Sequence, residues 1–372
     1  MILLVLASLL TQSVVPQDVA IPLDRGWDMN GDVRSESYLG RPALRMRTGR
    51  AFRRDVVFED GTIEFDMAVT PRRSFVYVQF RMQSESEHEE VYFRPHKSEL
   101  PDAVQYVPVW RGDSQWQFWH GPGATAALAF PRHEWIHVRL EIRGRQAALF
   151  VGEGSEPTML IPLAREPAPG YIALRAFTPA DGAPEGEMVA AYSNLVVRPG
   201  RTTHAFGPGP ASQRLPDGSV TRWRVSPAWA VTDEDVSTVP DSVLATRGNW
   251  PVRETDSSGR LLLARYMARP RPTGAAAARL TLRASTETLQ LLRLGYSDFA
   301  TVFVNGRPIF AGNASYSFDN PRQEGLVGLW QATVWLPLRA GDNELLVAVA
   351  DGFGGWGLMG QLVPQAGVEI IP

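Results

Sequence analysis

Apolar and polar side chains alternate in short runs along much of this 372-residue chain. Residues 62–69, 75–82 and 135–142 show the alternation most clearly. A period of two places successive side chains on opposite faces of a β-strand, and one apolar face per strand is typical of a sandwich. No stretch of about 12 residues, the usual length of a helix, shows a helical period. The pattern therefore predicts an all-β fold.

The first half of the chain reads as a series of strands separated by turns. The segments share an apolar side chain at every second position, or a concentration of aromatic residues in a short run. We expect strands at residues 62–69, 75–82, 91–96, 104–110, 116–120, 135–142, 146–151, 170–177 and 188–197.

The second half contains the strongest local signals. Residues 294–306 (LGYSDFATVFVNG) run from a Gly-Tyr-Ser-Asp corner through an apolar strand into an Asn-Gly turn. Residues 336–360 begin at a polar turn around Gly341 and Asp342, alternate through apolar residues, and end in glycines around Trp356. An Asn-Gly or Gly-Asp turn beside alternating apolar residues is typical of a β-hairpin.

Turn-forming residues separate the two halves. Glycine and proline are frequent, with 33 and 29 residues. Residues 199–218 are rich in Pro, Gly and polar residues and lack periodicity, which indicates a linker. The expected organisation is two β-sandwich (jelly-roll) domains, residues 20–198 and 219–372, joined by this Pro/Gly-rich linker.

The start of the chain predicts export. Residues 2–10 (ILLVLASLL) form an uncharged apolar run that is too short to span a bilayer. Small and polar residues follow, so cleavage after Ser13 would remove residues 1–13 as a secretory signal peptide. The alternative is a buried N-terminal strand. We expect an exported protein, periplasmic or extracellular, and no membrane span in its mature form.

The amino-acid composition excludes several kinds of site and partner. The chain has no cysteine, which excludes disulfides, thiol nucleophiles and thiolate metal sites. The formal net charge is −3, and the arginines are scattered among acids, so no nucleic-acid partner is expected. Among 37 basic residues only Lys97 is a lysine, a usage typical of a GC-rich bacterial genome.

One apparent metal motif has the wrong context. Residues 133–137 (HEWIH) match H-E-x-x-H, which binds zinc when both histidines lie on one face of a helix. Here Pro131 precedes the motif and an alternating run follows, so we expect a strand. In a strand, positions i and i+4 lie about 13 Å apart, too far for one zinc ion. The sequence therefore predicts no metal at His133 and His137.

Short strand segments of the first half carry a resemblance: residues 58–65 (FEDGTIEF), 80–81 (FR), 91–94 (VYFR), 134–138 (EWIHV) and 192–196 (YSNLV). Residues 20–198 resemble the concanavalin A-like jelly roll of laminin-G-type lectins, and especially 3-keto-disaccharide hydrolase-like domains. Those domains carry an Asn-Ser-Gly turn where this chain has residues 86–90 (SEHEE). The resemblance implies a sugar-facing sandwich more than it implies the hydrolase chemistry.

The second half resembles the galactose-binding-like jelly roll that accompanies many glycoside hydrolases. The resemblance rests on the order of the corner, the strand, the Asn-Gly turn, Pro337-Leu338 and residues 341–345 (GDNEL). It implies a second sugar-facing β-sandwich and names no reaction.

An acidic strand also resembles part of the family 16 glucanases. Glu64 and Asp66 alternate with apolar residues in residues 62–69. Retaining glycosidases need two carboxyl groups about 5 Å apart on one face, but Ala68 and Val69 stand where the further glutamate is needed. The favoured interpretation is a solvated strand face.

Candidate ligand-binding residues are concentrated between residues 90 and 120. Sugar sites combine flat aromatic faces with planar hydrogen-bonding groups. The alternative is that the tryptophans are core residues and that Trp356, bracketed by glycines, closes one end of its sandwich. The candidate in a loop of the second half is Trp356. The candidates on a concave face of the first half are Arg81, Arg94, His96, Gln105, Trp110, Trp116 and His120.

These observations favour a secreted, non-catalytic, lectin-like protein whose partner is a carbohydrate or glycoconjugate. One alternative is a glycoside or 3-keto-glycoside hydrolase or lyase with Arg94 and His96 on the concave face. Another is a structural or protein-docking module, which the pair of sandwiches would support by itself. The sequence indicates no cofactor, leaves calcium open, and assigns no catalytic residue.

Overall fold

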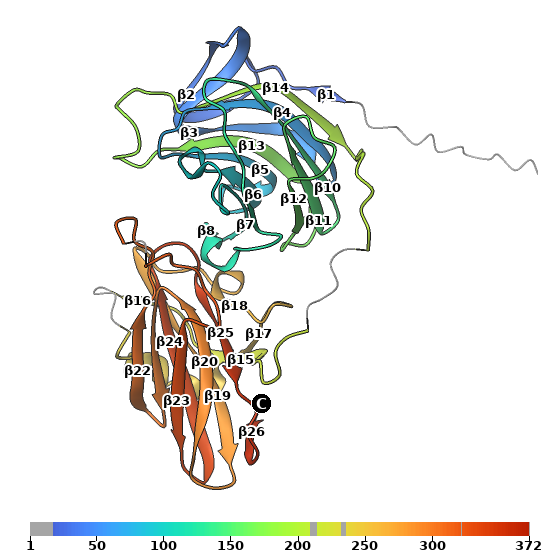
Figure 1. The fold of residues 1–372 in the computed structure, drawn as a ribbon. Helices are drawn as coiled ribbons and strands as arrows, with labels where there is room; N and C mark the ends of the chain where they lie inside the picture. The colour runs from blue at the N-terminus through green and yellow to red at the C-terminus, as the bar shows by residue number, and fades with distance from the viewer. Residues whose placement is uncertain (1–17, 209–213, 232–235, 321, 372) are drawn as a thin grey trace, which may run out of the picture.

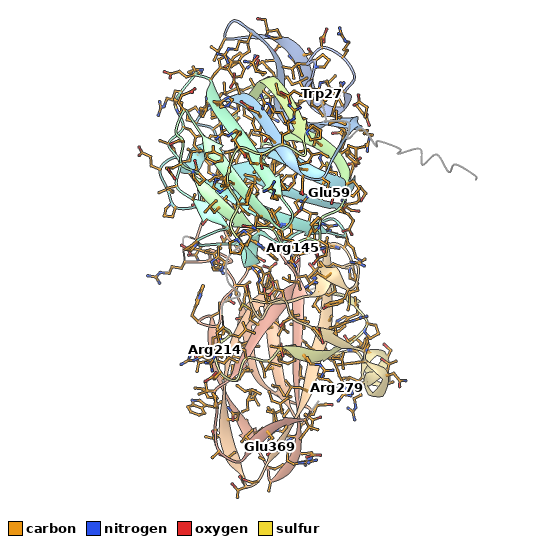
Figure 2. The ribbon with its side chains drawn as sticks, turned by 90° about the vertical axis from the view of Figure 1, so that its right-hand side faces the viewer. Trp27, Glu59, Arg145, Arg214, Arg279 and Glu369 are labelled. Carbon is orange, nitrogen blue, oxygen red and sulfur yellow. The ribbon has the colours of Figure 1, made fainter. Side chains whose placement is uncertain are left out.

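The computed structural model describes residues 18–208, 214–231, 236–320 and 322–371. The chain is built almost entirely of antiparallel β-strands, which confirms the all-β class with curled sheets of the sandwich type. Figure 1 shows two groups of sheets, one built by the first half of the chain and one by the second. In Figure 2, Trp27 and Glu369 lie at opposite ends of the long axis, so the two groups are stacked end to end.

The first group is a 14-stranded curled sheet with the order β12-β11-β10-β4-β14-β3-β13-β5-β6-β7-β8. Strand β1 pairs with β14, β2 with β3, and β9 with β7. The strands are β1 (Val19–Ala20), β2 (Asp28–Tyr38), β3 (Arg41–Phe58), β4 (Gly61–Val69), β5 (Phe75–Ser84), β6 (Glu87–Phe93), β7 (Val104–Trp110), β8 (Asp113–Ser114), β9 (Thr125–Ala126), β10 (Ile136–Arg143), β11 (Gln146–Val151), β12 (Met159–Pro162), β13 (Gly170–Phe177) and β14 (Ala190–Pro199).

The curl of this sheet encloses the main core. Apolar side chains from β4 and β10, such as Phe65 and Leu140, pack in one buried cluster with Val78 of β5 and Phe93 of β6. Burying an aliphatic or aromatic side chain of this size contributes about 1.5–3 kcal/mol. The period-two alternation of the sequence thus fixes which face of each strand enters the core.

The second group consists of two sheets. An eight-stranded sheet has the order β17-β15-β19-β24-β21-β22, with β16 and β26 also paired to β19, and a four-stranded sheet has the order β18-β25-β20-β23. The strands are β15 (Arg222–Val225), β16 (Trp229–Val231), β17 (Val252–Glu254), β18 (Leu261–Leu262), β19 (Thr273–Ala284), β20 (Thr288–Ser297), β21 (Phe299–Val304), β22 (Arg307–Asn313), β23 (Ala332–Leu338), β24 (Gly341–Asp351), β25 (Gly357–Leu362) and β26 (Val368–Ile371).

Helical segments are short. They are α1 (Asp241–Leu244) and the 3₁₀ turns η1 (Pro95–Lys97), η2 (Trp116–Phe118), η3 (Arg247–Asn249) and η4 (Leu263–Arg265). No helix among the residues that the structure describes is long and apolar enough to cross a membrane.

The Asn-Gly hairpin is confirmed. Asn305 and Gly306 connect β21 to β22 with φ of 51° and 78°. Positive φ at both central residues is the requirement of a type I′ turn, whose twist matches that of the paired strands. Strand β24 follows the expected Gly341 turn, and Leu345 and Val347 in it are fully buried.

One predicted strand is shorter than expected, and another is absent. The strand expected at residues 91–96 ends at Phe93, because Pro95 begins the 3₁₀ turn η1. Residues 116–120 do not form a strand, since Trp116–Phe118 is the 3₁₀ turn η2. The long hairpin β2–β3 was not expected, because β2 is almost wholly exposed and lacks an apolar alternation.

The expected linker lies between the two groups. Among its described residues only Pro199, the last residue of β14, takes part in strand pairing, opposite Gly61 of β4. Residues 209–213 and the expected signal peptide lie outside the described residues.

Candidate functional site

A row of polar and aromatic side chains crosses the first sheet on the side turned away from the main core. Paired strands place these residues directly opposite one another. From β3 through β13, β5 and β6 to β7 the row is Arg50, Arg175, Tyr77, Tyr92 and Gln105. The next row on the same side is Phe52, Ala173, Gln79, Glu90 and Val107. We call this side of the five strands the polar face.

Glu90 forms the charged centre of the polar face. Gln79 Nε2 donates a hydrogen bond of 2.7 Å to Glu90 Oε2, and His88 Nε2 lies 3.3 Å from the same oxygen. Burial alone would raise the pKa of Glu90, but the contacts with His88, Arg175 and Gln79 lower it below its ordinary value. The carboxylate is therefore ionised at neutral pH.

A second buried network joins Tyr92, Arg94 and Gln105. The Tyr92 hydroxyl donates to Gln105 Oε1 over 2.6 Å, and Arg94 Nη2 donates to both Tyr92 and Gln105. Burial raises the pKa of Tyr92 to about 12, so its phenol keeps its proton and can donate. Arg94 and Gln105 thus meet on one face, as expected from the sequence.

Arg94 differs from its expected role because an acid faces it. Its Nη1 donates to Asp102 Oδ2 over 2.5 Å and to the Asp102 carbonyl over 3.0 Å. With a relative exposure of 6% it holds the network together beneath the surface. Charge-assisted bonds of this kind are strong, so replacement of Arg94 would affect stability first. Arg94 is thus buried against an acid rather than open to solvent.

Four residues of the polar face keep part of their surface accessible: Phe75, Phe177, Arg175 and Arg50. The rings of Phe75 and Phe177 lie with centroids 6.1 Å apart, and Phe75 contacts Tyr92 at 6.0 Å. The Arg175 guanidinium lies 4.4 Å from the Tyr77 ring centre. Phe177 keeps 37% of its surface exposed. We call these four residues the platform; the two buried networks lie on the same sheet face and support it.

Arg81 belongs to the scaffold rather than to the platform. It is 1% exposed and its guanidinium donates to the Glu59 carbonyl, Asp60, Glu89 and the Gly144 carbonyl. These bonds occupy most of its donors. The expectation that Arg81 binds a ligand does not fit this burial.

His96 lies beside the platform without a charge. Its ring meets Phe75 edge-on at 5.4 Å. Burial, followed by the nearby Arg94 and Lys97 charges, lowers the pKa of His96 to about 4. The imidazole is therefore neutral near pH 7 and can act as a hydrogen-bonding group rather than as a cation.

Three predicted site residues lie at the junction between the two groups of sheets. Trp116 contacts Tyr316 at 5.4 Å and Phe353 at 5.9 Å. His120 Nε2 lies 2.9 Å from the Val327 carbonyl oxygen. Trp110 packs against Trp119 at 5.9 Å, and its ring faces Arg265 at 5.8 Å. No pattern in the sequence indicates that residues of the second half cover these side chains.

Trp356 is fully buried in the core of the second group of sheets. The expectation of an outward or cleft-lining Trp356 is wrong, and the alternative, a tryptophan packed within the sandwich, is observed. The glycines beside it have a different use. Gly354 has φ +112°, and a Cβ there would lie 2.6 Å from Trp116 Nε1, so Gly354 allows the loop to approach Trp116 closely.

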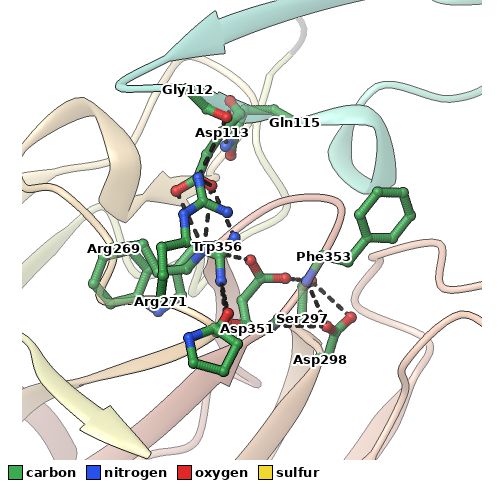
Figure 3. Close-up of polar contacts among 12 residues, drawn as sticks. Gly112, Asp113, Gln115, Arg269, Arg271, Ser297, Asp298, Asp351, Phe353 and Trp356 are labelled. Carbon is green, nitrogen blue, oxygen red and sulfur yellow. Dashed lines mark hydrogen bonds and ion pairs between the residues drawn. The ribbon is translucent and has the colours of Figure 1, made fainter. Parts of the chain in front are cut away.

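A buried charge cluster completes the junction (Figure 3). Arg269 Nη2 lies 2.9 Å from Asp113 Oδ1 of the first half, and Arg269 Nε lies 3.0 Å from Asp351 Oδ2. Arg271 adds a 2.7 Å contact to Asp113, and Asp298 lies beside Asp351. Burial and then the Asp298 charge raise the pKa of Asp351 well above its ordinary value, because three carboxyl groups here face two arginines.

The H-E-x-x-H segment is not helical, and only its last two residues lie in a strand. His133 precedes β10 with φ 55°, and His137 lies in β10. His137 Nε2 lies 3.0 Å from Glu64 Oε1 and its Nδ1 lies 2.8 Å from Asp66 Oδ1. Glu64 and Asp66 thus face an imidazole on the surface of the sheet opposite the main core. Within the described ranges no group of three or more His, Asp or Glu residues could hold a metal.

The second group of sheets contains a cavity of about 260 Å³ beside β15, β19 and β26. None of the predicted site residues lines it. Its walls are formed by residues of four strands, β15, β17, β19 and β26, and of the segment before β15, including Arg222, Arg224, Arg279, Thr281 and Ile371. It adjoins the strand that ends the described chain.

No protein-family model matches the chain, and no curated protein matches it. Solved structures with similar shape include the carbohydrate-binding module CBM66 from Bacillus subtilis, at 14% identity over 46% of this chain and 95% of that chain, with a TM-score of 0.35. The Bacillus licheniformis β-glucanase matches at 13% identity over 50% and 98%, also with a TM-score of 0.35.

A family 35 carbohydrate-binding module from an environmental isolate matches a shorter part of the chain. The identity is 20% over 26% of this chain and 71% of that chain, with a TM-score of 0.20. Likenesses at this level do not identify a ligand, so function has to be inferred from the side chains of the platform and its support.

Proposed function

We propose that the protein binds carbohydrate without catalysis, with the platform as its contact surface. The observation that carries the proposal is the combination of two adjacent aromatic rings, Phe75 and Phe177, with the partly buried Arg175 on the same face. Aromatic faces pack against the C–H groups of a sugar ring, and planar donors bind its hydroxyl groups. The buried networks of Glu90 and Arg94 hold this surface in one conformation, which reduces the cost of ordering on binding.

The proposal is tested by replacing one exposed ring. A glycan array with the mature chain identifies a ligand, and calorimetry then compares the wild type with Phe177→Ala. An aromatic contact contributes about 0.5–1.5 kcal/mol, so affinity should fall about two- to tenfold. Trp335→Ala is the control, because Trp335 is 57% exposed on β23 of the other group. Equal affinity in all three proteins, or no glycan bound by the wild type, contradicts the proposal.

A glycoside or 3-keto-glycoside hydrolase or lyase is the second candidate. The observation that favours it is the His88–Glu90 pair, a histidine and a carboxylate in contact beneath the platform. Both side chains are 2% exposed, which favours a supporting role, since a general base has to reach the substrate. Turnover of a 3-keto-glycoside that is abolished in Glu90→Gln, while the substrate still binds, would establish the enzyme instead.

The proposal includes export and two modules, residues 20–198 and 219–372, joined by residues 199–218. The apolar run at residues 2–10 supports export. The separation of strand pairing into two groups supports the two modules. The buried contacts at the junction indicate that the modules are held together rather than tethered loosely.

A further inference from the structure

Two arginines lie side by side on the platform. Arg50 of β3 and Arg175 of β13 are directly opposite each other in paired strands, on the same face. Like charges in this position repel and destabilise a sheet. The repulsion acts at a partly buried site, since the Arg50 side chain is 16% exposed. Burial and then the Arg175 charge lower the pKa of Arg50.

The carboxylates near this pair also have other partners. Arg50 Nη1 lies 3.1 Å from Glu85 Oε2, but Glu85 also faces Arg54 at 3.5 Å. Glu90 is already engaged by Gln79 and His88. Arg54 also pairs with Asp28, whose Oδ2 lies 3.0 Å from Arg54 Nε. Of the three arginines in this area, Arg175 is the one that forms no ion pair among the described residues.

Arg175 is the member of the pair that has no direct partner, although the Glu90 charge acts on it from a distance. Across the part of the chain that the structure describes, its guanidinium makes no hydrogen bond and no ion pair to a side chain; its close contact is the Tyr77 ring. The Nε atom of Arg50 is buried and also lacks a hydrogen-bond partner. Unpaired donors of this kind are rare in proteins unless a ligand or water uses them.

We infer that Arg50 and Arg175 bind the carboxylate of an acidic sugar, a uronate residue, on the platform. This inference rests on the proposed function of the same face. A guanidinium presents its donors in a planar fork that matches a carboxylate. Phe177 follows Arg175 by two positions on one face of β13, about 6.7 Å along the strand. A sugar ring over Phe177 and Phe75 can therefore direct its carboxylate toward the two guanidinium groups.

The inference is tested with one glycan in two forms. The strongest uronate-containing binder on a glycan array is compared, by calorimetry, with the same glycan after its carboxyl group has been reduced to the alcohol. Loss of a charge-assisted contact weakens binding about ten- to a hundredfold. We expect that loss on carboxyl reduction in the wild type, and the same loss of acidic-glycan affinity in Arg175→Gln or Arg50→Gln.

The variants should lose less affinity for the reduced glycan than for the acidic glycan, because only the acidic form presents a carboxylate to the two guanidinium groups. Arg283→Gln is the matched control, because Arg283 pairs with Asp342 in an exposed position on the second group of sheets, and it should keep the preference for the acidic form. Near-equal wild-type affinity for the two forms overturns the inference, as does an equal loss of both forms in Arg175→Gln. Equal binding of a sulfated analogue overturns the carboxylate assignment.

Failure of this inference can be distinguished from failure of the proposed function. If neutral glycans bind and depend on Phe177 while no acidic preference exists, the platform binds sugars and the arginine pair does not select them. If no glycan of either kind binds the folded wild type, the proposed function is wrong as well.

Discussion

Replacement of Arg269 by methionine should destabilise the whole protein. The Arg269 side chain is 2% exposed and lies between Asp113 of the first half and Asp351 of the second. Its Nη1 also donates to the Asp351 carbonyl over 2.7 Å and to the Pro272 carbonyl over 2.9 Å. Methionine keeps much of the length and apolar volume of the side chain but none of these bonds.

The expected loss in the free energy of unfolding depends on which contacts of the two aspartates remain after the substitution. Removing one partner of a buried ion pair costs about 3–5 kcal/mol, because the other charge stays buried without compensation. Arg271 still contacts Asp113 at 2.7 Å, so we expect the lower end, about 3 kcal/mol. With a urea dependence of about 3 kcal/mol per molar, at the upper end of the range for small proteins, the unfolding midpoint should fall by about 1 M.

Urea unfolding followed by tryptophan fluorescence measures this effect. Arg283→Met is the control, because the Arg283–Asp342 pair has the same ion types but side chains 55% and 54% exposed, and exposed pairs of this kind are screened by water and salt. The midpoint of Arg283→Met should equal that of the wild type. A midpoint in Arg269→Met that is no lower than in Arg283→Met would refute the reasoning that the junction cluster stabilises the fold.

Three further predictions concern export, the boundary between the two halves and the buried carboxyl group of Asp351. N-terminal sequencing of the exported protein should begin after residue 13, and a chain that still starts at Met1 would contradict the signal peptide. Limited proteolysis should cut first within residues 199–218 and leave two folded pieces; cleavage elsewhere, or unfolding of both halves when they are expressed separately, would show that the boundary is misplaced or that the junction is obligatory. The raised pKa of Asp351 means that the folded state keeps a proton that the unfolded state releases above about pH 4. The free energy of unfolding should therefore decrease as pH rises from about 4 through the folded-state pKa. Asp351→Asn should flatten this decrease, and an unchanged pH profile would show that Asp351 does not hold the proton.

Hairpin turns and core-facing strands could be predicted from the sequence, because neighbouring residues in the chain determine them. Asn305 and Gly306 adopt positive φ more easily than most residues, so their hairpin could be read directly from the sequence. The alternation in β4, β5 and β10 exists because one face of each strand enters the core. The side chains of β2 do not need to alternate, because water reaches nearly all of them and β3 pairs along one edge of the strand. The sequence of β2 therefore shows no apolar alternation.

The binding face could be predicted only in part. Period-two alternation identified Tyr77 and Gln79 as polar positions of one strand, but it does not give the register between strands. The neighbours Arg50 and Arg175 are brought together by pairing between β3 and β13, which are far apart in the chain. Whether Arg94 faces water or an acid depended on Asp102, which η1 and the loop after it return to the guanidinium.

The junction shows why some aromatic residues that were candidates for ligand binding have a different role. Tryptophan and tyrosine are preferred both in sugar contacts and in interfaces between protein surfaces, because each buries a large apolar face and keeps one polar group. Sequence composition cannot distinguish the two uses. The structure separates them by partner: Trp116 faces Tyr316 and Phe353 across the junction, whereas Phe177 faces solvent beside Phe75. Trp116 also packs against the buried cluster of Tyr77, Tyr92 and Val107 on the polar face, so a loosened junction should disturb the platform through Trp116.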